Sequence, residues 1–292
     1  MPVWMRVPGI GVPPSGRFRT GPPDGLPTQK DLRTRAFCRR IHVILAILLL
    51  SDSSILQAAP PPTPSGPPTA EDLAAGQALA EHLRSAVPEE NSDIHGRLII
   101  KADGVTREIP IVCRVILNQT NWETDYETSA TAESAAERLV IYHSTNGPNL
   151  YLYARAASPA AALPALTPLP AASATNSLAG SDFSLGDLGL EFLHWPVQRQ
   201  LKGEMRLGQP CYVLESSNSQ PAEIVRVRSD IDKESGGPLI ADAYDAQGHI
   251  VKEYSLHGSS FKKVNGRWQL EKMDIRNKKT NSHTELKFDL NK

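Results

Sequence analysis

The chain has 292 residues, of which 40% are hydrophobic and 6% aromatic, a composition that suits one soluble domain with appended segments. Its 31 lysines and arginines nearly balance its 32 aspartates and glutamates, so there is no basic surplus of the kind that binds nucleic acid. The 24 prolines gather near the N-terminus and around residues 159–170, which marks those stretches as linkers or loops.

Residues 1–58 are predicted to be a secretory signal with a long leading region. Three arginines between residues 35 and 40 precede an apolar run at residues 41–50, and a small-residue exit follows. The run is too short to span a bilayer comfortably, although an uncleaved anchor has the same pattern. We expect the protein in the periplasm, tethered to the membrane if the signal is retained. A proline-rich linker is predicted at residues 59–68.

Two cysteines remain once the predicted signal is removed. Cys38 leaves with it, and Cys113 and Cys211 form an even pair in an oxidising compartment. Each lies in a strand-like segment, so a disulfide between them and two separately buried thiols both fit the sequence. Neither has a second cysteine or histidine at ligand spacing, so no metal site is predicted.

A single domain is predicted over residues 69–292, and it begins with a helix. Thr69 and Asp72 have the spacing of a capping box. From Asp93 the hydrophobic period changes from 3.6 to 2, which predicts antiparallel strands joined by tight turns such as Asp103-Gly104. Apolar faces are predicted for these strands at Leu98, Ile100, Val115, Leu117, Leu139, Ile141, Leu150 and Leu152.

The pattern of alternation is interrupted twice in this half of the domain. Residues 122–128 are polar and are predicted to form an edge or outward-facing strand. Residues 156–180 are rich in Ala, Pro, Ser and Leu without periodicity, which predicts a long loop insertion. Long loops inside compact domains are often functional or mobile.

A helix is predicted next, over residues 184–194. Ser184 can cap it and Asp187 can complete a capping box, while Phe183 and Leu188 have the spacing of a hydrophobic staple. Leu185, Leu188 and Phe192 recur on one face. The stripe fits a packing helix, and it also fits a lid over an apolar sheet face. Pro196 ends the helix.

Eight further strands are predicted between residues 200 and 290, with Leu286 and Phe288 sharing the apolar face of the last. About eleven or twelve antiparallel strands exceed what an open flat sheet carries comfortably, so we expect the sheet to curl. Two helices would cover its apolar concave face only in part. The remainder would be a hydrophobic cavity or groove.

Signatures of catalysis are missing from the sequence. There is no G-x-S-x-G, H-E-x-x-H or G-x-x-x-x-G-K-[ST] pattern. The histidines are scattered, and His194 is read as a helix-end residue near the C-terminal dipole rather than a catalyst. No cofactor is predicted. A hydrolase with an unrecognised site is the least favoured alternative.

Three stretches resemble a known family. They are Ser181-Asp-Phe-Ser-Leu-Gly-Asp-Leu188, Gly208-Gln-Pro-Cys-Tyr-Val-Leu-Glu215, and the run from Ile224 through Tyr244-Asp-Ala-Gln-Gly248 to Thr284. Together they resemble the outer-membrane lipoprotein-sorting protein family, the LolA-like group, in particular its branch with an S-D-F-S-x-x-D-L helix start. The resemblance covers roughly residues 93–290. The insertion at residues 156–180 and the long N-terminal extension depart from the family pattern.

The resemblance implies a fold and a function. The fold would be mainly β, a curled antiparallel sheet forming an unclosed half-barrel with covering helices. The protein would be a monomeric, non-enzymatic periplasmic carrier whose partners are lipoprotein acyl chains or other lipid and the inner- and outer-membrane sorting machinery. A periplasmic sensor or protein-interaction domain on the same half-barrel, without lipid transport, is the alternative.

Candidate site residues follow from combining the alternation with this function. We expect the hydrophobic cavity to be lined by Leu98, Ile100, Val115, Leu117, Leu139, Ile141, Leu150, Leu152, Leu286 and Phe288. We expect the lid helix to present Phe183, Leu185, Leu188 and Phe192. Burying an acyl chain against such a face stabilises the complex by about 0.8 kcal/mol per methylene.

Overall fold

The structure is a computed structural model, and it describes residues 67–118, 121–145, 147–256, 260–264 and 267–290. The predicted signal and all but the last two residues of the predicted linker lie outside the described residues. Within the described ranges, no helix combines the length and the apolar character needed to cross a membrane.

Thirteen strands of the described chain form one antiparallel sheet, in the order β6-β5-β4-β3-β2-β1-β15-β14-β11-β10-β9-β8-β7. β12 and β13 form a separate two-stranded hairpin. The strands are β1 Ser92–Ala102, β2 Val105–Leu117, β3 Trp122–Thr128, β4 Glu137–His143, β5 Leu150–Arg155, β6 Thr167–Pro168, β7 Val197–Arg206, β8 Gln209–Ser217, β9 Arg226–Asp232, β10 Pro238–Tyr244, β11 Ile250–Ser255, β12 Phe261–Val264, β13 Arg267–Leu270, β14 Lys272–Asn277 and β15 Ser282–Phe288.

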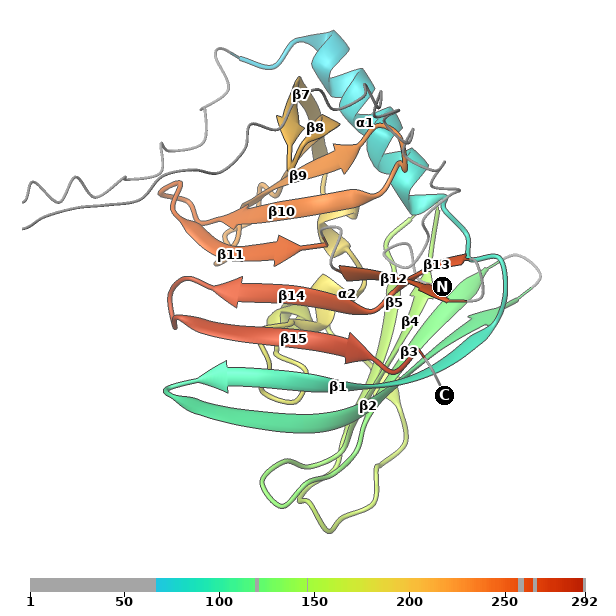
Figure 1. Ribbon diagram of the computed structural model, residues 1–292. Coiled ribbons are helices and arrows are strands. Elements are labelled where there is room, and N and C mark those ends of the chain that lie inside the picture. Colours follow the sequence, from blue (N-terminus) through green and yellow to red (C-terminus); the bar gives the residue numbers. More distant parts are fainter. Residues whose placement is uncertain (1–66, 119–120, 146, 257–259, 265–266, 291–292) are drawn as a thin grey trace, which may run out of the picture. The chain divides into compact units, whose positions relative to one another are not determined.

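The sheet is open, as predicted. Its end strands β6 and β7 do not pair with each other in the described chain, so the sheet does not close into a barrel. Figure 1 shows that it curls, because β3, β4 and β5 run at a steep angle to β10, β11, β14 and β15. We call the face that carries the buried hydrophobic cluster the concave face.

The described part of the chain contains few helices, and all of them except α1 are short. They are α1 Ala70–Arg84, α2 Leu185–Leu188 and the 3-10 turns η2 Ala171–Thr175 and η3 Glu191–His194. The predicted capping box at the start of α1 is confirmed: the Asp72 amide donates to the Thr69 hydroxyl, and the Thr69 amide donates to the Asp72 carboxylate. α1 packs closely on β7, since a Cβ added to Gly76 would lie 2.6 Å from the Arg199 backbone.

The prediction that residues 122–128 form an edge or outward-facing strand is wrong. β3 lies inside the sheet, between β2 and β4. Its polar residues are accommodated by pairing: Asp125 is only 2% exposed, and it accepts hydrogen bonds from Arg114 at 3.2 Å and from Arg138 at 2.9 Å. The hydrogen bonds to Arg114 and Arg138 offset the desolvation cost of burying this carboxylate, because both arginines are held on neighbouring strands.

No disulfide joins Cys113 to Cys211, and both are free, buried thiols. The sheet order explains this, because six strands separate β2 from β8. The two residues are therefore seven strand spacings apart, about 34 Å along the sheet at roughly 4.8 Å each, far beyond disulfide reach. The alternative of two separate thiols is therefore the correct one.

Candidate functional site

Residues 176–195, which we call the plug segment, fold back on themselves over the concave face. The Leu178 amide donates to the Phe183 carbonyl, and the Leu185 amide donates to the Asn176 carbonyl, both at 2.9 Å. The turn between them contains Gly180 at φ +68°, a conformation that glycine adopts without steric cost. These internal bonds make the plug segment a compact unit rather than an extended loop.

The helix predicted over residues 184–194 is shorter than expected. Its capping box is confirmed, since the Asp187 amide donates to Ser184 and the Ser184 amide donates to Asp187. The α-helix ends at Leu188, however, and η3 follows only after Leu190 adopts the left-handed conformation at φ 53°. Gly189 explains the break: a Cβ there would lie 2.2 Å from the Tyr151 hydroxyl, so the chain passes where only glycine fits.

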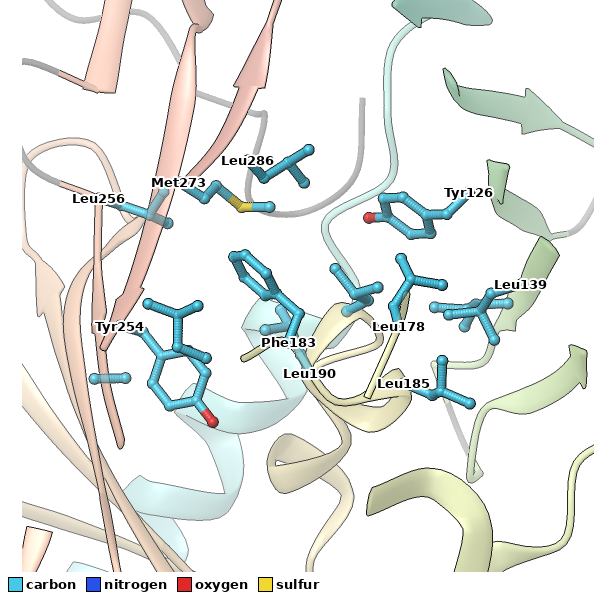
Figure 2. Close-up of a cluster of buried hydrophobic side chains, with 14 of the residues drawn as sticks. Tyr126, Leu139, Leu178, Phe183, Leu185, Leu190, Tyr254, Leu256, Met273 and Leu286 are labelled. Carbon is cyan, nitrogen blue, oxygen red and sulfur yellow. The ribbon is translucent and has the colours of Figure 1, made fainter. Parts of the chain in front are cut away.

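Apolar side chains of the plug segment fill the space above the sheet. All four residues predicted for the lid are buried there, together with three other leucines of the segment. Figure 2 shows Phe183 and Leu190 between two walls, with Tyr126 and Leu139 on one side and Tyr254, Leu256 and Met273 on the other. The buried residues of the plug segment are Leu178, Phe183, Leu185, Leu188, Leu190, Phe192 and Leu193.

Most residues predicted to line a cavity face the plug segment. Leu98 and Leu286 lie directly opposite each other on β1 and β15. Val115 is buried outside the hydrophobic cluster, and Leu117 is half-buried. The members of the cluster from that set are Leu98, Ile100, Leu139, Ile141, Leu286 and Phe288. That they contact a lipid stays a prediction.

The assignment of Leu150 and Leu152 to the concave face is wrong. Leu150 is 54% exposed, and Leu152 is partly exposed. The register places Tyr151 opposite Ile141 and Tyr153 opposite Leu139, so the tyrosines of β5 face the core instead. Both faces of this strand carry side chains that are apolar enough to be buried. The tyrosines point inward because their hydroxyls find hydrogen-bond acceptors there.

Two carboxylates attach the plug segment to one side of the sheet. Asp182 accepts hydrogen bonds from the hydroxyls of Ser282 and Thr284 on β15. Its amide also donates to the Thr284 hydroxyl at 3.0 Å. These residues are at most 9% exposed, so the bonds are shielded from water.

The second carboxylate, Asp187, binds β11. Lys252 Nζ donates to Asp187 at 2.8 Å and to the Asp182 carbonyl at 2.9 Å, and the Tyr254 hydroxyl donates to Asp187 at 2.8 Å. Burial, together with the negative charge of Asp187, raises the pKa of Tyr254 well above its ordinary value, which keeps it a donor. We call the six residues the latch: Asp182, Asp187, Lys252, Tyr254, Ser282 and Thr284.

On the opposite wall the plug segment is held by side chains of β4 and β5. The Ala179 amide and the Tyr153 hydroxyl both donate to Glu137, at 2.8 and 2.9 Å. The Tyr151 hydroxyl donates to Glu191 at 2.6 Å, and burial raises the pKa of that carboxyl. The plug segment is thus bonded to both walls of the curled sheet.

Little empty space remains under the plug segment. One cavity of about 20 Å³ lies beside Leu188 and Leu193, and another of about 10 Å³ lies between Phe183 and Met273. Such volumes hold about one water molecule each. The plug segment therefore occupies the concave face, and a large apolar ligand could reach that face only by displacing it.

Sequence reasoning missed the residues that hold the plug segment in place. The S-D-F-S-x-x-D-L motif predicts a helix start, but its two aspartates also bind strands about 65 and 100 residues away. Lys252 was a visible signal, because a lysine in a strand that is otherwise apolar on one face requires a partner. The described residues hold no group of His, Cys, Asp and Glu arranged to bind a metal.

Comparisons with known proteins agree with this architecture. A family model described only as an uncharacterized protein matches residues 128–291, more than half of the chain. A solved domain described as an outer membrane lipoprotein-sorting protein, from Vibrio parahaemolyticus, is similar with a TM-score of 0.59 and 18% identity, over 74% of this chain and 91% of that one.

A second solved structure has the same fold. It is a DUF1329 family protein from Desulfovibrio piger, with a TM-score of 0.56 and 18% identity, over 75% of this chain and 92% of that one. No curated protein matches the chain. At these identities the likeness to the two structures shows the fold alone, a large antiparallel sheet that stays open.

Proposed function

This chain belongs to the family of uncharacterized proteins whose model matches its residues 128–291, and from that premise and its lipoprotein-sorting fold we propose that it is a periplasmic carrier. It takes the acyl chains of lipoproteins or other amphiphiles out of water and acts by binding, without catalysis. The predicted export signal at residues 1–58 supports the location.

The observation that carries the proposal is the chemistry of the plug segment. Its seven buried apolar side chains occupy a concave face that is apolar on both walls. They are attached to the sheet at discrete polar points rather than by strand pairing. A segment held in this way can leave without breaking the sheet, and an acyl chain can take the apolar surface that it vacates.

The exchange sets one hydrophobic burial against another, because lifting the plug segment uncovers its seven buried apolar side chains, each of which contributes about 1.5–3 kcal/mol when buried. A chain of sixteen carbons gains roughly 12 kcal/mol on leaving water, at about 0.8 kcal/mol per methylene. This gain has to exceed the cost of lifting the plug segment, whose latch is a small set of hydrogen bonds and one ion pair. Weakening the latch therefore favours the loaded state, because the closed state competes with the ligand.

The test compares binding of a fluorescent fatty acid to the natural protein and to Asp187→Asn. This variant leaves Lys252 without its anionic partner, so we expect the apparent affinity to rise about tenfold. Asp93→Asn is the matched control, because Asp93 is exposed and lies outside the latch. Lipid analysis of protein purified from the native envelope should find a bound amphiphile.

Two outcomes would contradict the proposal. One is that the purified protein contains no lipid and that neither the natural chain nor Asp187→Asn binds the fatty acid. The other is capture of a single protein partner with no lipid, which would favour the alternative of a periplasmic sensor on the same fold.

A further inference from the structure

A small pocket with both polar and apolar walls lies at the C-terminal end of the plug segment, and no residue of the latch lines it. It surrounds the cavity of about 20 Å³ and is built from four separate parts of the chain: the end of α1, the end of β4, the turn that leads to β5, and η3 with the residues before it. Its lining residues are Leu83, Arg84, His143, Ser144, Asn149, Leu188, Gly189, Leu190, Leu193 and His194.

Three basic side chains converge on this pocket, and no carboxylate of the described chain lines it. Arg84 Nη1 donates to the Leu193 carbonyl, while Arg84 Nε is buried without a hydrogen-bond partner. Arg84 forms no ion pair with any residue that the structure describes. A guanidinium with a buried unpaired donor is the strongest recognition group for a carboxylate or phosphate that side chains offer.

The two histidines are held rigidly beside it. The His143 ring stacks on Trp122, with ring centres 3.6 Å apart and planes within 8°, and it shares a hydrogen bond with the Thr124 hydroxyl. His194 is fixed at the end of η3. Both rings are therefore positioned before any ligand arrives, which lowers the entropic cost of binding.

The pKa shifts of the three basic groups indicate that the pocket lacks a negative charge. Burial, followed by the charge of His194, lowers the pKa of His143 to about 3. Burial, followed by the charge of Arg84, lowers the pKa of His194 to about 4. Burial also lowers the pKa of Arg84, and the only carboxylate of the described residues that opposes this is Glu81, one turn back on α1. An anion placed among the three would reverse each of these effects.

We propose that this pocket binds the oxyanion of an anionic head group, a carboxylate or a phosphate, between Arg84, His143 and His194. The apolar remainder of the lining is Leu83 of α1 together with Leu188, Leu190 and Leu193, and the last three belong to the plug segment. It directs the attached chain toward the concave face. The present cavity of about 20 Å³ has room for one oxygen atom of such a group. The inference rests on the proposed function, because it names the charge of the cargo.

The test is an NMR titration of the two imidazole rings in the full-length, isotope-labelled protein, from about pH 7 down to about pH 4. Without ligand we expect both rings to stay neutral over most of that range. With octyl phosphate we expect their pKa values to rise by at least about 1 unit. Octyl glucoside, which has the same chain and a neutral head group, should leave them unchanged.

The variants assign the effect to the pocket. Arg84→Gln should remove the response to octyl phosphate, and Arg97→Gln, at a side chain on β1 that is 43% exposed, should keep it. If Arg84→Gln does not fold, His194→Gln at its half-buried position serves instead. It should lower the affinity for octyl phosphate about tenfold relative to octyl glucoside.

Each outcome decides something. A response to inorganic phosphate equal to that to octyl phosphate would support the oxyanion site and identify its ligand as a free anion. No response to either, or a response that persists in Arg84→Gln, would overturn the inference. A fatty-acid probe in the same samples separates the two proposals: probe binding without ring titration removes only the pocket, and ring titration without probe binding removes only acyl carriage.

Discussion

Two aspartates of one short motif attach the plug segment to the sheet, and each has more than one role. Asp187 closes the capping box of α2 and also accepts from Lys252 and Tyr254. Asp182 presents its amide, carbonyl and carboxylate to the sheet at once. A single substitution at either position therefore removes several buried interactions together, which is where large effects on stability arise.

Replacing Asp182 by alanine should destabilise the fold by about 2–4 kcal/mol, because the buried hydroxyls of Ser282 and Thr284 lose their acceptor. Urea unfolding followed by circular dichroism measures this as a lower midpoint. Asp93→Ala, at an exposed position, should stay within about 0.5 kcal/mol of the natural protein. Equal stability of the two variants would show that the latch does not hold the plug segment.

At the scale of elements, strands β7 to β10 carry a charged cluster on the face opposite the plug segment. Asp230 on β9 is 3% exposed. It pairs with Arg206 at 3.3 Å, while its Oδ1 has no hydrogen-bond partner. Burial, followed by the charge of Glu204, raises the pKa of Asp230 to about 6. Arg228 and Asp242 are the other charges that face it.

This shift predicts a pH dependence. Between about pH 4 and about pH 6 the folded protein holds a proton on Asp230 that the unfolded chain has released, so the stability that this group contributes falls as pH rises through that window. The natural protein should lose up to about 3 kcal/mol relative to Asp230→Asn across it. Urea midpoints at several pH values check this, and parallel curves for the two proteins would contradict it.

The sequence could predict most of the strands and turns and how both α-helices are capped, because these depend on period and on neighbours a few residues away. It missed β6, which lies inside the predicted loop at residues 156–180. It could not predict which face of β5 points inward, since the two faces of Leu150-Tyr-Leu-Tyr153 are similarly apolar. Tyr151 and Tyr153 are turned inward by Glu191 and Glu137, on segments that only the folded sheet brings close.

The length of the lid helix depended on a contact of the same kind. Gly189 is a poor helix former, yet the break there is fixed by the Tyr151 hydroxyl, 38 positions earlier. The prediction from the stripe of Leu185, Leu188 and Phe192 was right about burial and wrong about continuity. The local sequence pattern identifies which residues are buried, and tertiary contacts determine whether the backbone that carries them is a continuous helix.

At the scale of the whole described domain, the order of the strands controls which distant residues can meet. β1 joins the two halves of the sheet by pairing with both β2 and β15. Cys113 and Cys211 fall on opposite halves and stay apart. Stability therefore rests on packing and on buried polar bonds, without a covalent crosslink between these two residues.

Alkylation of the protein should reflect this arrangement. In denaturant without reductant, both cysteines should react and be found as modified peptides by mass spectrometry. In the folded protein Cys113 should be protected, because it is fully buried and burial raises the pKa of its thiol to about 12. Recovery of an unmodified, linked pair of peptides under denaturing conditions would contradict the structure.

The chain between β6 and β7 has one further property. Those strands are the two opposite edges of the sheet, and the stretch that joins them contains the entire plug segment. This stretch connects the two edges of the open sheet, and β6 and β7 fix its two ends. The distance between β6 and β7 and the position of the plug segment are consequently coupled. A displacement of the plug segment away from the sheet therefore also changes the separation of these two edge strands.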